Sequence, residues 1–310
     1  MSRIHEALKK AAQERHAQMA ERSNGVAVDL TSEGLTHSVV PESLPLDPRT
    51  DAVNGRDRTL LRFEEFLKKC QRPAWNLPPG ASVFAADRTD HVGAEKFRTL
   101  RSRLYQIQAT RPLRKLLVTS SLPEEGKTFT VANLAQSIVR QPERRVLLID
   151  ADLRSSRLHR MFGAPEKPGL SDYLRGDADE FAVMQVGPQG NLCLIPGGDD
   201  VTNPSELLHS ERMRQFLDKM AQVFDWVILD SPPALAVHDA SMLADMCDGV
   251  MFVVRAGSTD FQLAEKASLE FREKNLLGVV LNRVDRHESY GTYYYGYSPE
   301  KATPGEKGAQ

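Results

Sequence analysis

Residues 116–128 are Leu116-Leu117-Val118-Thr119-Ser120-Ser121-Leu122-Pro123-Glu124-Glu125-Gly126-Lys127-Thr128. The apolar start predicts a short buried strand, and the Gly-Lys-Thr end predicts a turn that opens a helix. Backbone N–H groups of such a turn and the positive end of the following helix converge on one spot, where phosphate groups bind. Ser121 replaces the first glycine of G-x-x-x-x-G-K-[ST], but the strand before the turn and the apolar helical pattern after it supply the expected context.

This loop predicts a nucleotide site with a defined set of side chains. Lys127 is expected to reach the β- and γ-phosphates, and the Thr128 hydroxyl is expected to bind Mg²⁺. The residues expected around the nucleotide are Ser121, Pro123, Glu124, Glu125, Gly126, Lys127, Thr128 and Phe129. The alternative is an accidental Gly-Lys-Thr in a surface turn, which the next two segments disfavour.

Two later segments repeat one design, an apolar run that ends in carboxylates. Residues 145–152 end in Asp150 and Asp152, and residues 224–233 contain Asp230 directly after an apolar run. Both runs predict buried parallel strands, and ligands of open α/β sheets bind at the carboxyl ends of such strands. An aspartate after a strand is more often a helix cap or turn residue. Together with the strand that leads into the Gly-Lys-Thr turn, these two runs make three strand ends with polar functional residues in one chain, which favours a shared site.

Size and composition narrow the class of protein. The 310 residues are enough for one sizeable α/β domain with an appendage, and the net charge of −2 gives no sign of a nucleic-acid partner. Three scattered cysteines without C-x-x-C spacing favour a reducing cytoplasm over a disulfide frame or a zinc site. The apolar stretches are much shorter than the roughly 18 residues of a membrane span, and the N-terminus has no hydrophobic signal core. The chain is therefore expected to be neither secreted nor integral to a membrane.

The chain divides into four predicted parts. Residues 1–21 form a short amphipathic helix, either a docking peptide for a partner or a weakly structured leader. Residues 22–90 form a linker with a short helix, and residues 91–285 form a domain of alternating strands and helices, with Asn203 capping one helix and Pro204 starting it. This alternation predicts a doubly wound, mostly parallel sheet flanked by helices.

The fourth part, residues 286–310, is rich in tyrosine. Five of the seven tyrosines of the chain lie within eight residues, interrupted by glycine: Tyr290, Tyr293, Tyr294, Tyr295 and Tyr297. A packed aromatic strand is the simpler interpretation, but the polar residues that follow leave nothing obvious to bury it against. Phenols on a flexible segment near a phosphoryl-transfer site resemble substrates.

Together these segments resemble the bacterial tyrosine kinases of capsule and exopolysaccharide biosynthesis, in the form whose cytoplasmic kinase is separate from its membrane activator. The loop 120–128 is similar to the family's S-x-x-P-G-E-G-K-T, with Glu124 in place of glycine, and residues 147–154 and 228–233 resemble its two acidic motifs. Residues 1–12 are similar to the start of exosortase-associated autokinases. The resemblance implies a P-loop NTPase fold of the MinD/ParA type, with ATP and Mg²⁺ as cofactors.

The resemblance also implies roles for single residues. Lys127 and the loop amides clamp the phosphates, while Thr128, Asp152 and Asp230 hold Mg²⁺ directly or through water. Asp150 is the candidate that orients and deprotonates the incoming tyrosine, because a phenol of pKa about 10 is mostly protonated at neutral pH. The acceptors are the tail tyrosines of a neighbouring subunit. Glu124 adds negative charge near phosphate where glycine often supplies an unusual backbone angle, so slower catalysis or altered affinity is expected.

Assembly and partners follow from the same resemblance. Glu95-x-x-Arg98-x-x-Arg101 resembles the element by which these kinases form rings, although Arg103 stands where the family has asparagine; otherwise it is a solvated charged face. The expected partners are a membrane-embedded polysaccharide co-polymerase (chain-length regulator) as activator, further copies of the chain and a cognate tyrosine phosphatase, with no nucleic acid. The expected location is the inner face of the plasma membrane, reached through the activator.

Two other functions remain open at this stage. The first is a P-loop ATPase that positions division sites or partitions plasmids; such proteins carry a second lysine at the loop position where this chain has Leu122. The second is a nucleotide-binding adaptor of a polysaccharide export complex with little catalysis. The missing lysine and the tyrosine tail favour the kinase.

Overall fold

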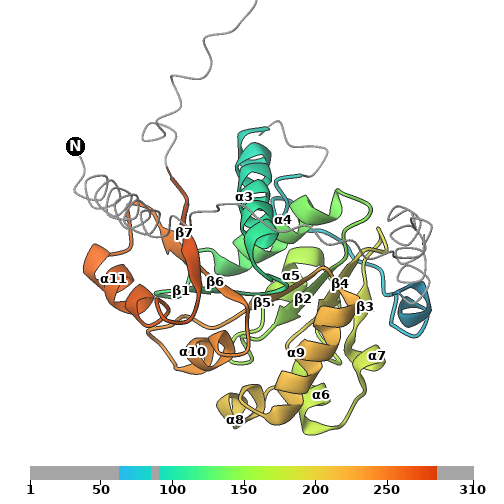
Figure 1. Cartoon of the computed structure of the whole chain (residues 1–310). Coiled ribbons are helices and arrows are strands. Elements are labelled where there is room, and N and C mark those ends of the chain that lie inside the picture. The colour runs from blue at the N-terminus through green and yellow to red at the C-terminus, as the bar shows by residue number, and fades with distance from the viewer. Residues whose placement is uncertain (1–62, 85–90, 285–310) are drawn as a thin grey trace, which may run out of the picture. The chain divides into compact units, whose positions relative to one another are not determined.

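The computed structural model describes residues 63–84 and 91–284 (Figure 1). The predicted amphipathic helix at 1–21, most of the linker and all five tail tyrosines lie outside the described residues. Within the described ranges no helix is both long and apolar enough to cross a bilayer.

Seven strands form one sheet in the order β3-β4-β2-β5-β1-β6-β7. Their bounds are β1 Lys115–Ser120, β2 Val146–Asp150, β3 Gln185–Val186, β4 Leu192–Ile195, β5 Trp226–Asp230, β6 Gly249–Arg255 and β7 Leu276–Asn282. All neighbouring pairs are parallel except β3 with β4, where Gln185 lies opposite Leu194. The expected mostly parallel, doubly wound sheet is confirmed, and the two-residue antiparallel β3 is an addition that the apolar pattern did not indicate.

Helices connect these strands. The longer ones are α3 His91–Thr110, α4 Lys127–Val139, α9 Glu211–Val223 and α11 Phe261–Leu269, and the shorter ones are α5 Leu158–Phe162, α6 Leu170–Arg175, α7 Glu180–Val183, α8 Pro204–Leu208 and α10 Asp239–Ala244. Pro204 begins α8 as expected. Asn203 stands at the cap position, but its side-chain amide donates to Glu206 Oε2 at 2.9 Å instead of capping the helix, so the cap prediction was wrong in this detail.

The two faces of the sheet carry different helices (Figure 1). On one face, Leu116, Val118 and Leu148 pack with α3, α4 and α5; on the other, Leu117, Leu147 and Leu229 pack with α6, α9, α10 and α11. Alternate residues of the same strand thus enter different cores, which explains why these strands are apolar at every position.

Residues 63–84, which the sequence assigned to the linker, are packed onto this domain. Phe63 meets Phe224 at the end of α9, with ring centroids 5.5 Å apart, and residues 63–67 are helical. Trp75 is buried on the other side of the sheet against Phe162 of α5. The segment therefore contributes to both cores.

The topology brings three strand ends together. In the sheet order β2, β5 and β1 are neighbours, and all three are parallel. Their carboxyl ends therefore meet at one edge, where β1 leads into the Gly-Lys-Thr loop and β2 and β5 end in Asp150 and Asp230.

Candidate nucleotide-binding and phosphoryl-transfer site

The glycine of the loop is required by the backbone and by a neighbour. Gly126 stands at the N-cap of α4 with φ +96°, in the left-handed region that side chains rarely adopt. A Cβ added there would lie 1.9 Å from Asn282 Nδ2, at the end of β7. Lys127 and Thr128 follow as the first residues of α4, so the loop amides and the positive end of a 13-residue helix face one point.

Glu125 holds the loop from inside. Its side chain is buried, and its carboxylate accepts a hydrogen bond from Leu122 N at 2.7 Å and another from the Thr259 hydroxyl. The Glu125 carbonyl accepts from Asn282 Nδ2 at 2.9 Å. Thr259 thus ties the loop to the segment after β6, Asn282 ties it to the end of β7, and the bond from Leu122 N closes the loop on itself.

Glu124 is exposed, like the neighbouring Pro123. It has φ +63°, one of three non-glycine residues with positive φ in the part of the chain that the structure describes. The backbone angle that glycine would supply is therefore adopted here by a side-chain-bearing residue, at a cost of about 1–2 kcal/mol.

Lysine, threonine and two aspartates converge beside the loop. Lys127 Nζ lies 3.0 Å from Asp152 Oδ2, and the Thr128 hydroxyl donates to Asp230 Oδ2 at 2.6 Å. Burial alone would lower the pKa of Lys127, but the charges of Asp230 and Asp152 outweigh it and raise the pKa. Lys127 is therefore a fixed cation at this edge.

Asp150 lies deeper than the other carboxylates and is fully buried. Its Oδ2 accepts from Ser156 Oγ, Arg157 N and Leu158 N at 2.8–3.0 Å, whereas within residues 63–84 and 91–284 Oδ1 accepts from Asp152 N alone, at 3.2 Å. Burial, reinforced by the charge of Asp230, raises the pKa of Asp150. One oxygen thus anchors the turn after β2, and the other has spare capacity to accept a proton.

The donor set fits a magnesium ion held jointly with a nucleotide. Asp230 is buried and its Oδ1 has no hydrogen-bond partner among the described residues, while burial raises the pKa of this carboxyl against the opposing charge of Lys127. A cation would satisfy that oxygen. The described residues contain no group of three or more His, Cys, Asp or Glu able to hold a metal by themselves. Mg²⁺ is commonly bound by one or two carboxylates together with substrate phosphates, so the arrangement suits it.

The remaining loop residues lie as follows. Ser121 is buried, and its hydroxyl has no partner among the described residues; Pro123 is exposed. Phe129 is half-buried and its ring packs against Phe97 of α3, with centroids 6.1 Å apart, so only its backbone faces the loop. The structure therefore brings Gly126, Lys127 and Thr128 together with the aspartates, and turns the Phe129 ring toward α3.

The charged residues predicted for assembly divide into two groups. Glu95 and Arg98 form an exposed ion pair on α3, with side-chain exposures of 63% and 43%. Arg101 instead donates from Nη1 to the Ser137 carbonyl at 2.6 Å, which fastens α3 to α4. Glu95 and Arg98 are open to a neighbour, and Arg101 has an internal partner.

Thr259 and Asn282 were missed from the sequence, although both hold the loop. Asn282 ends a parallel strand at the same edge as Asp230, so the rule that found the aspartates would also have found it. Thr259 lies in the connection after β6 and has no comparable signal, because its partner Glu125 is 134 residues away in the sequence.

Comparison with known proteins agrees with this geometry. Residues 116–304 match the model of the CobQ/CobB/MinD/ParA nucleotide binding domain. The tyrosine-protein kinase YwqD of Bacillus subtilis is 34% identical over 219 residues, which cover 69% of this chain and 91% of YwqD. The tyrosine-protein kinase etk of Escherichia coli K12 is 35% identical over 245 residues, 76% of this chain.

Lengths differ among these relatives. The chain spans nearly all of YwqD but only 32% of etk and 31% of the tyrosine-protein kinase wzc of Salmonella typhimurium. Among solved structures, the kinase domain of Escherichia coli tyrosine kinase ETK superposes with a TM-score of 0.62 at 32% identity, over 71% of this chain and 87% of that domain. The chain therefore belongs to the CobQ/CobB/MinD/ParA nucleotide-binding family and, within it, to the bacterial tyrosine-protein kinases.

Proposed function

We propose that the chain is an ATP-dependent tyrosine autokinase that phosphorylates the tail tyrosines Tyr290, Tyr293, Tyr294, Tyr295 and Tyr297 of a neighbouring subunit. The observation that supports it best is the convergence of Lys127, Thr128, Asp152 and Asp230 at one sheet edge in a chain of this family. Phosphoryl transfer needs positioning and charge neutralisation more than covalent chemistry, and this edge supplies both.

The side chains have separate tasks in this reaction. Lys127 leaves its ion pair with Asp152 and binds the β- and γ-phosphates instead. The loop amides hold the remaining phosphate oxygens. Thr128, Asp152 and Asp230 would hold Mg²⁺ directly or through water, and the bound ion would supply positive charge beside the phosphates. Asp150 uses Oδ1, its less occupied oxygen, to accept the phenol proton. The tyrosine oxygen bonds to the γ-phosphorus as the bond to the ADP oxygen breaks.

Assembly brings the acceptor to the site. We propose that Glu95 and Arg98, with Arg101 supporting α3 from inside, contact the next subunit of a ring. Each phosphotyrosine adds about −1.5 to −2 charge, so five add roughly −8 to −10, and their repulsion favours dissociation of the ring. A tyrosine phosphatase would reset the cycle.

The proposed setting is exopolysaccharide or capsule synthesis and export. A membrane-embedded co-polymerase would act as activator and hold the chain at the inner face of the plasma membrane. This assignment rests on the family, whose named members are tyrosine-protein kinases.

The test is label transfer from radiolabelled ATP to the purified full-length chain in Mg²⁺. We expect phosphotyrosine on the wild type and none on Lys127→Met. Release of free phosphate alone would indicate an ATPase of the division-site or partition type. Nucleotide binding without transfer, even with the activator, would indicate an adaptor.

Two further variants separate the aspartates. Asp150→Asn is expected to lower turnover by about a hundredfold or more, the usual contribution of a general base, at unchanged Mg²⁺ dependence. Asp152→Asn is expected to raise the Mg²⁺ concentration required. Intact turnover in Asp150→Asn, with activity abolished in Asp152→Asn at saturating Mg²⁺, would overturn the assignment of the base.

A further inference from the structure

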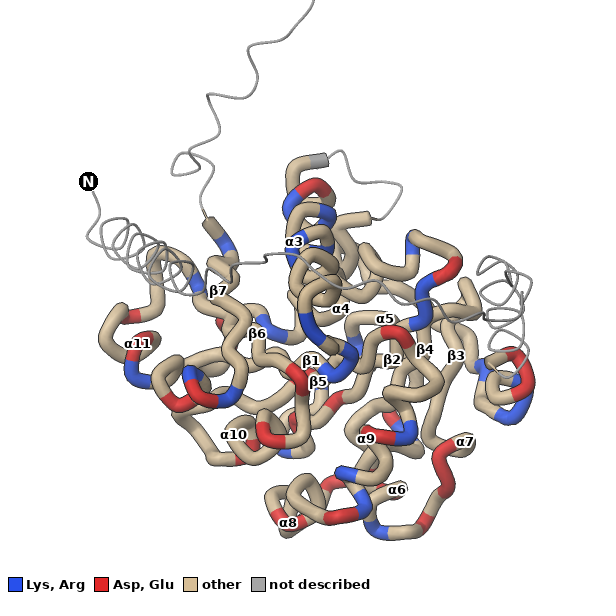
Figure 2. Tube along the Cα trace, viewed as in Figure 1, with Lys and Arg blue, Asp and Glu red and all other residues tan. Residues whose placement is uncertain are grey.

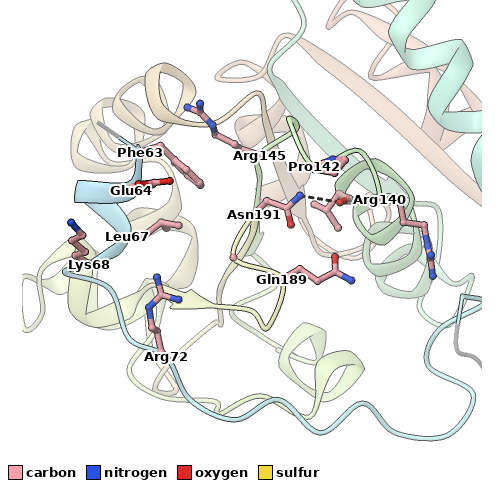
Figure 3. Close-up of a pocket in the computed structure, with 12 residues that line it drawn as sticks. Phe63, Glu64, Leu67, Lys68, Arg72, Arg140, Pro142, Arg145, Gln189 and Asn191 are labelled. Atoms are coloured by element: carbon pink, nitrogen blue, oxygen red, sulfur yellow. Dashed lines mark hydrogen bonds between the residues drawn. The ribbon is translucent and has the colours of Figure 1, made fainter. Parts of the chain in front are cut away.

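A cleft of about 770 Å³ has no residue of the Gly-Lys-Thr loop in its lining. Figure 3 shows the side chains that line it. One wall is the segment from Phe63 to Arg72, and the other includes Arg145 and Asn191, which directly precede β2 and β4. The cleft is therefore at the amino-terminal edge of the sheet, whereas the Gly-Lys-Thr loop is at the carboxyl edge. An occupant of the cleft would not compete with a nucleotide.

The charged lining is mostly positive, with Lys68, Arg72, Arg140 and Arg145 against the single acid Glu64. Arg140 donates to the Phe84 carbonyl at 3.0 Å, and the Arg145 guanidinium stacks on the Phe63 ring at 4.6 Å. Lys68 and Arg72 are exposed and have no ion-pair partner within residues 63–84 and 91–284. These two cations can bind an anion without breaking an existing ion pair.

Apolar surface lies beside the cations. Phe63, Leu67, Val139 and Pro142 line the cleft itself. A second pocket of about 110 Å³ shares Val139, Arg140 and Gln189 with the cleft. Its aromatic walls are Trp75 and Phe162, beside the exposed Leu77. The combined surface suits an anionic aromatic group next to a second aromatic ring.

We propose that this cleft binds phosphotyrosine, and that its occupant is the phosphorylated C-terminal segment of a second copy of the chain. The proposal rests on the autokinase function proposed above. Cations on one wall meet the phosphate, apolar side chains meet its phenyl ring, and the aromatic pocket takes a neighbouring ring. Tyr293, Tyr294 and Tyr295 are consecutive, so a phosphorylated ring in this segment always has another ring beside it.

A second copy is the better source of this segment than the same chain. The tail follows β7, which ends at the carboxyl edge, and four strand spacings of about 4.8 Å separate β7 from β2. To reach its own cleft the tail would have to pass around the domain to the opposite edge, whereas the tail of another copy has no such restriction. Docking would thus link phosphorylated copies through a surface other than the exposed face of α3.

The test is fluorescence anisotropy of a synthetic peptide of residues 288–299 carrying phosphate on Tyr294, titrated with the full-length, phosphatase-treated chain without ATP. We expect saturable binding, at least tenfold weaker for the unphosphorylated peptide. Lys68→Gln/Arg72→Gln should weaken binding at least tenfold. The matched control Lys266→Gln/Arg272→Gln removes one lysine and one arginine from exposed positions on and after α11 and should bind like the wild type.

Four results would overturn the proposal. They are equal binding of both peptides, wild-type binding by Lys68→Gln/Arg72→Gln, displacement by an ATP analogue that fills the loop site, and displacement by AMP as readily as by phosphopeptide. The last would make the cleft a nucleotide site. Because the peptide is synthetic, its binding does not depend on kinase activity. A chain that binds it but transfers no label refutes the kinase alone, and a chain that transfers label but binds no phosphopeptide refutes the docking alone.

Discussion

Replacement of Glu124 by glycine should stabilise the chain. Glu124 has φ +63°, and the left-handed region costs a residue with a side chain about 1–2 kcal/mol that glycine does not pay. The substitution also costs about 0.4–1 kcal/mol of stability, because glycine makes the unfolded state of the variant more flexible. The difference is a net gain of about 0.8 kcal/mol from the middle of both ranges, which for a domain of this size raises Tm by roughly 2–3 °C. Removal of an exposed negative charge beside the phosphate position should also tighten nucleotide binding, most clearly at low salt.

Three variants separate backbone strain from charge. Glu124→Gly relieves both, Glu124→Gln removes only the charge, and Glu124→Asn removes the charge while tolerating the left-handed angle better than glutamine does. Calorimetry should therefore rank Tm as glycine above asparagine above glutamine, with glutamine close to the wild type. Nucleotide titration should show tighter binding for all three. An equal Tm rise in Glu124→Gln would refute the role of backbone strain.

Three further predictions concern the loop, α3 and a buried histidine. Glu125→Ala should cost about 1–3 kcal/mol in urea unfolding, because Leu122 N loses its acceptor, and should weaken nucleotide binding; unchanged affinity would contradict its role in holding the loop. Arg101→Ala should lose about 1.5–3 kcal/mol of stability, because Arg101 bonds to the Ser137 carbonyl of α4. The exposed Arg98→Ala should lose less than about 1 kcal/mol but reduce the oligomeric fraction in light scattering. The reverse pattern would contradict an internal role for Arg101 and an external role for Arg98. Burial lowers the pKa of His159, so the unfolded chain binds a proton on this imidazole more readily than the folded chain, and stability should fall as pH drops below about 6.5. The Tm of His159→Gln should lose that part of the pH dependence. Identical profiles of Tm against pH for the variant and the wild type would refute this role of His159.

Local pattern was sufficient to predict the sheet and the positions of the site aspartates. Strands β1, β2 and β5 are each an apolar run closed by a polar residue, and parallel strands put those closing residues at one edge. Asp150 and Asp230 lie opposite each other in neighbouring strands for this reason. The charged residues coloured along the trace in Figure 2 show no comparable regularity, and α3 illustrates why. Glu95, Arg98 and Arg101 are evenly spaced along it, but Glu95 and Arg98 form an exposed ion pair while Arg101 bonds to the Ser137 carbonyl of α4.

Contacts between distant residues could not be predicted in this way. Glu125 was expected beside the nucleotide because of its place in the loop, but its side chain is fixed by Thr259, and its carbonyl by Asn282. Residues 63–84 have the proline content of a linker, yet Phe63 and Trp75 are buried in cores assembled from much later segments. Periodicity reports how a segment folds and does not identify its partner, so the cleft beside Arg72 has no signature in the sequence.

Transfer between two copies tests the central claim most directly. Full-length Lys127→Met, which keeps its tail, is mixed with an active chain truncated after residue 285 in the presence of ATP and Mg²⁺, and phosphopeptides are identified by mass spectrometry. We predict phosphate on one or more of the tyrosines between 290 and 297 of the Lys127→Met chain and none when that chain is incubated alone. A tail that stays unmodified while the active chain hydrolyses ATP would contradict the account.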